Sequence, residues 1–106
     1  EQVLAVPVEG VGVILISGCG HPGLERMVRT AEQVLDRPVA GIVGGLHYGE
    51  QVTPAVEEGI ALLAERDPAL VALSPHDTGS AGLSVFETAF PGPYRRIAVG
   101  EPIVVR

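Results

Sequence analysis

The sequence predicts an α/β domain built on one mixed β-sheet, with its helices on a single face. Three apolar runs rich in Val and Ile, residues 13–17, 39–46 and 70–74, are typical of buried strands. A segment with helical spacing of apolar residues follows each run, which is the alternation expected of parallel strands joined by helices. Short right-handed crossovers with one layer of helices keep those helices on one side of the sheet.

The amino-terminal residues predict a β-hairpin. Two β-rich runs, residues 3–8 and 13–17, flank the turn signal Glu9-Gly10-Val11-Gly12. Proline cannot donate to a strand ladder, so Pro7 places the first run at a sheet edge or at a bulge.

Three helices are expected between and after the parallel strands. Residues 22–35 carry one apolar stripe, with Pro22 suited to the first turn. Thr53-Pro54 starts a second helix, which ends before Asp67-Pro68. Ser80 is expected to cap a third, short helix. Residues 94–99 and 102–105 then predict a closing hairpin, so that residues 1–106 form a single domain in the order β-β-α-β-α-β-α-β-β.

Composition excludes several classes of partner. The formal net charge is −6 and Arg95-Arg96 is the only basic pair, which argues against binding to nucleic acid or to an anionic membrane surface. No apolar run reaches the roughly 20 residues of a membrane span, and no signal-peptide pattern opens the chain. A single cysteine rules out an internal disulfide and fits a reducing, cytoplasmic location.

The hydrophobic content is high for a small domain. Hydrophobic residues make up 46% of the chain and the mean hydropathy is +0.34. Strand residues 13–16 and 70–73 are apolar on both sides, which in a parallel or mixed sheet means that both faces are covered. Helices on one face leave the other face for a partner.

Chemically active side chains gather where the predicted parallel strands end. All three histidines of the chain, His21, His47 and His76, come just after such a strand, and Cys19 lies in the first of these turns. The carboxyl ends of parallel strands share one edge, so we expect these side chains to converge. Imidazole and thiolate suit Zn²⁺, and Asp77 offers a carboxylate beside them.

Two other interpretations start from the same turn. Residues 18–23 satisfy the G-x-G-x-x-G pattern of nucleotide-binding turns, but the acidic residue expected about 20 positions later is replaced by Gly44-Gly45-Leu46-His47. Cys19, at a helix start near His21, is alternatively a reactive thiol, although no oxyanion partner or resolving cysteine can be named.

Three short motifs in register resemble the carboxyl-terminal half of metallo-β-lactamase-fold hydrolases. Residues 16–24 read Ile-Ser-Gly-Cys-Gly-His-Pro-Gly-Leu, residues 43–47 read Val-Gly-Gly-Leu-His and residues 73–79 read Leu-Ser-Pro-His-Asp-Thr-Gly. They are similar to the G-C-S-H-P-G, G-G-F-H-L and P-C-H-C-T-G motifs of the branch that includes dihydropterin-type phosphate synthases. The resemblance covers nearly the whole chain. It implies half of an αββα sandwich and a hydrolase that acts on a small molecule through metal-activated water, with Zn²⁺ or another divalent transition metal.

The resemblance also implies roles for individual residues. His76 matches the last metal-binding histidine of the family, and Cys19 matches the position where many relatives have a metal-bridging aspartate. His21 and His47 match histidines particular to this branch, and we assign His21 to the metal and His47 to acid–base catalysis. Asp77 replaces a cysteine of the usual motif and is assigned as a carboxylate ligand of the metal.

The family's H-x-H-x-D-H motif, which supplies most of the metal ligands, is absent. The chain is therefore expected to be half of a fold that pairs with a second copy or with an amino-terminal half-domain chain. Alone it should be weakly active or inactive. The alternative is a non-catalytic α/β half-domain that pairs with itself or with a partner.

Overall fold

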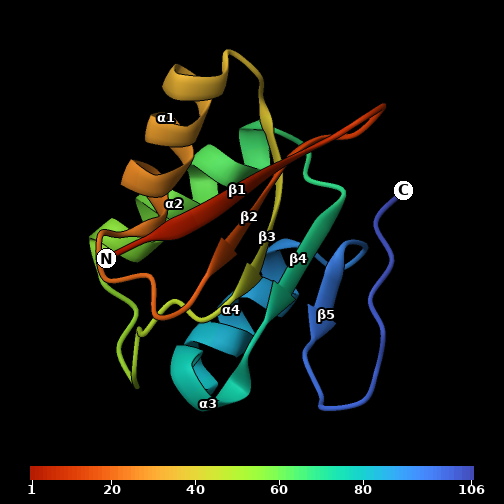
Figure 1. The fold of residues 1–106 in the computed structure, drawn as a ribbon. Coiled ribbons are helices and arrows are strands. Elements are labelled where there is room, and N and C mark those ends of the chain that lie inside the picture. Colours follow the sequence, from red (N-terminus) through yellow and green to blue (C-terminus); the bar gives the residue numbers. More distant parts are fainter.

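A computed structural model describes residues 1–106, which form five strands and four helices around one sheet (Figure 1). The strands are β1 (Val3–Val8), β2 (Gly12–Ser17), β3 (Val39–Gly44), β4 (Leu70–Leu73) and β5 (Tyr94–Arg96). The helices are α1 (Leu24–Leu35), α2 (Pro54–Glu65), α3 (Pro75–Thr78) and α4 (Ser80–Ala89). No helix combines the length and the hydropathy that a membrane span requires.

The sheet follows the order of the chain. Its strand order is β1-β2-β3-β4-β5, with β1 antiparallel to β2 and every other neighbouring pair parallel. The predicted hairpin and the mixed sheet are confirmed. Pro7 lies on β1, the edge strand, where its missing N–H leaves no gap inside the sheet.

The helices α1, α2 and α4 cover one face of the sheet, as predicted (Figure 1). Alternate residues of the central strands, among them Leu15, Ile42 and Val71, point to this face and are fully buried. They join one cluster of 17 buried side chains with residues of the three helices, and Phe86 of α4 is its largest fully buried member. This single core holds the strand ends in fixed positions.

The opposite face of the sheet, here called the outer face, is apolar and carries no helix. It is formed by the other alternation of strand residues, which lie outside the main core: Leu4, Val6, Ile14, Ile16, Val43, Leu70 and Ala72. Ile14 packs above Gly41, where a side chain would collide with the Ile14 Cδ1 atom. Leu4 and Ile16 pair across β1 and β2 and remain 60% and 42% exposed. Exposure is therefore concentrated at the β1 side of this face.

Three predictions about the ends of elements were wrong. Ser80 is the first residue of α4 and not its cap, because Gly79 is the N-cap and the Ser80 hydroxyl donates to Glu50 Oε2. Helix α1 begins at Leu24 instead of Pro22, because Pro22 lies in the preceding turn. The closing hairpin does not form: β5 ends at Arg96 and residues 97–106 contain no strand. The turn is present, since the Glu101 N–H donates to the Ala98 carbonyl, but the segment after it begins with Pro102, which has no N–H to donate.

A side-chain cluster connects the helices α1 and α2 at the amino edge of the sheet. The Arg66 guanidinium donates two hydrogen bonds to the Glu32 carboxylate, with N···O distances of 2.9 and 3.0 Å. Glu32 Oε1 also accepts the Val39 N–H at 3.0 Å. The cluster therefore connects α1, the end of α2 and the start of β3. These hydrogen bonds, from Arg66 first, lower the pKa of Glu32, although partial burial opposes the shift.

Replacing Glu32 with glutamine is expected to lower the free energy of unfolding by about 2 kcal/mol, because charge-assisted hydrogen bonds are lost. The folded-state pKa of Glu32 lies below its ordinary value of 4.5, so this stabilisation is full above that value and disappears as the pH falls through the lowered pKa. Urea unfolding at neutral and at acidic pH measures both effects. Glu25→Gln is the matched control, because the Glu25–Arg29 pair is exposed and should change stability by less than about 0.5 kcal/mol. Equal losses in the two variants would contradict the prediction.

Candidate functional site

The carboxyl ends of β2, β3 and β4 bring all the predicted site residues to one edge of the sheet. Cys19 and His21 lie in the turn after β2, His47 follows β3, and His76 and Asp77 belong to α3 directly after β4. The parallel pairing of these strands places the three ends side by side. The predicted common edge is therefore present in the structure.

Within this edge, three side chains make direct contact. The rings of His21 and His47 have their centroids 4.5 Å apart, with 46° between the ring planes. His47 Nδ1 lies 3.3 Å from Asp77 Oδ1. His76 is exposed and makes no ring contact or hydrogen bond with the other two histidines. The chain thus brings His21, His47 and Asp77 together and leaves His76 apart from them.

The backbone around His47 explains how its ring reaches these neighbours. His47 has a φ of 48°, in the left-handed region, which non-glycine residues rarely adopt and which costs free energy. The preceding residues are Gly44 and Gly45. A Cβ atom on Gly44 would overlap the Ser17 carbonyl, so only glycine allows β2 and β3 to approach this closely at their ends.

Gly45 forms a cradle for the Asp77 carboxylate. A Cβ atom on Gly45 would overlap both Asp77 Oδ2 and the Gly18 carbonyl oxygen. Asp77 Oδ2 is buried and has no hydrogen-bond partner, whereas Oδ1 faces His47. An unpartnered buried carboxylate oxygen is costly, and a cation or a proton donor would satisfy it.

The electrostatic surroundings of Cys19 are negative. The charge of Asp77, followed by burial and the charge of Glu1, raises the pKa of the Cys19 thiol. The thiol is therefore held in its protonated form, which disfavours the reactive-thiolate interpretation, because the thiolate is the nucleophile. A cation bound at this edge would instead lower the pKa of the Cys19 thiol.

Glu1 is a site neighbour that the sequence reasoning missed. Its Oε2 accepts the Gly20 N–H at 2.9 Å and its Oε1 accepts the His21 N–H at 3.3 Å, so that it holds the turn that carries Cys19 and His21. The hairpin register could have revealed it. Val3 pairs with Ser17, which places the residues before Val3 beside the turn after Ser17.

The donors fit a soft or borderline divalent metal by type, since they are imidazole, thiol and carboxylate. The unpartnered Asp77 Oδ2 also fits such an ion. The arrangement is incomplete, however, because no three His, Cys, Asp or Glu side chains lie close enough together to hold a metal ion. These side chains therefore do not form a complete metal site.

A cavity of about 180 Å³ adjoins the two contacting histidines. His21 and His47 line it together with Leu46, Tyr48 and the first turn of α2, which includes Val56. Tyr48 stacks on Phe86 with a centroid distance of 6.0 Å, and burial raises the pKa of its hydroxyl. The cavity thus gives a small molecule access to both imidazoles from the helix side of the sheet.

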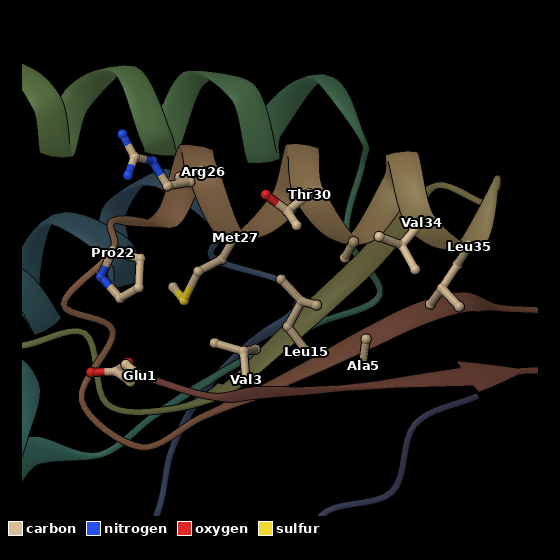
Figure 2. Close-up of a pocket in the computed structure, with 11 residues that line it drawn as sticks. Glu1, Val3, Ala5, Leu15, Pro22, Arg26, Met27, Thr30, Val34 and Leu35 are labelled. Carbon is tan, nitrogen blue, oxygen red and sulfur yellow. The ribbon is translucent and has the colours of Figure 1, made fainter.

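A second pocket, of about 350 Å³, lies between α1 and the strands β1 and β2 (Figure 2). Figure 2 shows Met27 of α1 directed toward Leu15 and Val3 of the sheet. Its lining is mostly apolar and includes no histidine or cysteine. It meets the candidate site at Glu1 and Pro22, which border the turn of Cys19 and His21.

The strand order disfavours the nucleotide-binding interpretation of residues 18–23. Dinucleotide sites lie where the strand order of a doubly wound sheet reverses. Here the order β1-β2-β3-β4-β5 contains no reversal, so no such crevice exists beside the turn.

Comparisons with known proteins give a structural match only. No known protein family and no curated protein matches the sequence. Among solved structures, the chain is similar to a metal-dependent hydrolase of the β-lactamase superfamily, with a TM-score of 0.82 and 23% sequence identity. The match covers 100% of this chain and 41% of that protein, so the chain spans about two fifths of its length. The fold is therefore α/β, that of one half of the β-lactamase-superfamily hydrolase it matches.

Proposed function

We propose that this chain is the carboxyl-terminal half of a metal-dependent hydrolase with the metallo-β-lactamase fold, acting on a small molecule. The observation that carries the proposal is the contact of His21, His47 and Asp77 at the carboxyl edge of the parallel strands. The fold match supports it, since the similar structure is a metal-dependent hydrolase.

The proposed roles follow from donor type and position. His76, His21, Cys19 and Asp77 contribute to the metal side of the site, and His47 moves a proton to or from the reacting molecule. A bound Zn²⁺ or similar ion would supply Lewis acidity and lower the pKa of water. The cavity beside His21 and His47 admits the substrate, and Glu1 keeps the turn of Cys19 and His21 in place.

The missing ligands are proposed to come from a second half of the fold. The outer face supports this, because it is apolar and lacks helices, and because Leu4 and Ile16 are exposed on it. Its partner is an amino-terminal half-domain chain or a second copy of this chain. A reducing, cytoplasmic environment remains our prediction from the single cysteine.

The isolated chain is expected to bind Zn²⁺ and Co²⁺ weakly, with micromolar or higher dissociation constants. It is also expected to show little hydrolysis. The reason is that no three donors are close enough to hold one ion. Co²⁺ titration followed by absorbance tests this, because a thiolate ligand adds a charge-transfer band that Cys19→Ser should abolish. His21→Ala should weaken binding further, whereas Gln33→Ala on the exposed side of α1 should not.

Two results would contradict this prediction. Tight binding by the isolated chain, or robust turnover that a chelator abolishes, would show that its own ligands suffice. Absence of any effect of Cys19→Ser and His21→Ala on Co²⁺ spectra would remove those residues from the proposed site.

One observation favours a second candidate function, a non-catalytic half-domain that pairs with itself or a partner. This observation is again the incomplete donor set. Metal content after purification with the natural partner separates the two. A metal-free complex without hydrolase activity would favour the non-catalytic candidate.

A further inference from the structure

We infer that Asp77 is the positioning residue of His47: its Oδ1 holds the proton-bearing Nδ1, which leaves Nε2 as the atom through which His47 acts. The use of His47 in hydrolysis rests on the proposed function. Which of its ring nitrogens carries the proton is inferred from geometry alone. Asp77 then orients the His47 ring in addition to its proposed role in metal binding.

The first step is the restriction of the His47 ring. Its left-handed backbone, with φ at 48°, sets the direction of the side chain. One ring face meets His21 at a centroid distance of 4.5 Å, and one ring nitrogen, Nδ1, lies 3.3 Å from Asp77 Oδ1. Two neighbours from two different strand ends therefore define the orientation of one imidazole.

The second step is the chemistry of the Nδ1–Oδ1 contact. A carboxylate has only acceptor oxygens, so a hydrogen bond between the two atoms requires the proton on Nδ1. No Arg forms an ion pair with Asp77, and its Oδ2 has no hydrogen-bond partner. The Cys19 thiol and the His47 ring are the two groups beside Asp77 that can offer a proton, and it is the His47 ring that faces Oδ1. The contact thus selects one of the two neutral forms of the imidazole.

The third step concerns the other nitrogen. With the proton on Nδ1, Nε2 carries the free electron pair, and the His47 side chain is 59% exposed beside the cavity that it lines with His21. When Nε2 accepts a proton from a reacting molecule, Nδ1 keeps its own proton and its contact with Asp77 Oδ1. No bond to Asp77 has to form or break. Asp77 therefore orients His47 without itself touching the substrate.

The test measures the protonated nitrogen directly. The ¹⁵N-histidine-labelled, chelator-treated chain is examined by long-range ¹H–¹⁵N NMR at mildly alkaline pH, with His47 assigned by comparison with His47→Gln. We expect the Nδ1–H form to predominate in the wild type. In Asp77→Ala we expect the Nε2–H form, which free imidazole side chains prefer, to become the major one. Glu58→Ala is the matched control, because Glu58 is an exposed carboxylate within α2.

A wild-type His47 found mainly as Nε2–H would overturn the inference, and so would an unchanged ratio in a folded Asp77→Ala chain. If Asp77→Ala fails to fold, the wild-type spectrum still decides the question, and Asp77→Asn tests the loss of charge with the shape retained. The measurement needs no metal and no turnover. The expected spectra with an inactive reconstituted complex would therefore refute the proposed function alone, whereas an active complex with the wrong tautomer would refute the inference alone.

Discussion

Replacing Gly45 with alanine is expected to destabilise the domain by about 3 kcal/mol and to displace the Asp77 carboxylate from His47. The new Cβ would overlap Asp77 Oδ2 on one side and the Gly18 carbonyl oxygen on the other. A side-chain oxygen can rotate away, but a backbone carbonyl at the end of β2 cannot move without disturbing the sheet. The addition of one methyl group should therefore lower the stability of the domain and also displace the Asp77 carboxylate.

The control for this prediction is Gly18→Ala. Gly18 lies in the neighbouring turn at the same edge, its φ is not in the left-handed region, and a Cβ there meets no atom within 4 Å. Urea unfolding gives the stability of both variants, and the His47 tautomer reports the position of Asp77. A Gly45→Ala chain as stable as Gly18→Ala, with the wild-type His47 tautomer, would show that there is room for a Cβ atom between Asp77 and the Gly18 carbonyl.

The sheet could be predicted because short local sequence patterns identify its strands. Runs of Val and Ile without alternation identify buried parallel strands, and Pro7 identifies an edge. The carboxyl-terminal hairpin could not be judged in the same way. Residues 102–105 have β propensity, but pairing depends on donors and on a neighbouring strand, and Pro102 supplies no N–H.

The site was predictable only to the level of its edge. Parallel topology places His21, His47 and His76 together at the strand ends, whatever their side chains do. Which of them touch depends on the left-handed conformation of His47 and on the one-turn helix α3, and neither has a clear signal in the sequence. The role of Glu1 depends on the hairpin register and becomes visible only when the two strands are aligned.

The second large effect that we expect is association of the chain through the outer face. We expect the chain to associate in solution through this face at micromolar concentration, because Leu4 and Ile16 are exposed side by side on it and contiguous apolar patches larger than a few hundred Å² are rare on monomers. At about 25 cal/mol per Å², burial of such a patch contributes on the order of ten kcal/mol before the costs of association. Sedimentation velocity over a range of concentrations measures the oligomeric state.

Ile16→Glu should convert the associated form to a monomer. Ile16 is 42% exposed on the outer face, so a carboxylate there is solvated in the monomer but buried without a partner in the complex. Each loss of about 1.4 kcal/mol weakens association tenfold, and an unpaired buried charge costs several times that. Val34→Glu is the matched control. Val34 is even more exposed, at 75%, but it lies on α1, which covers the opposite face, and its substitution should leave association unchanged. A wild-type chain that stays a soluble monomer at every concentration would mean that the outer face does not bind a second copy, and the amino-terminal half-domain would remain as its proposed partner.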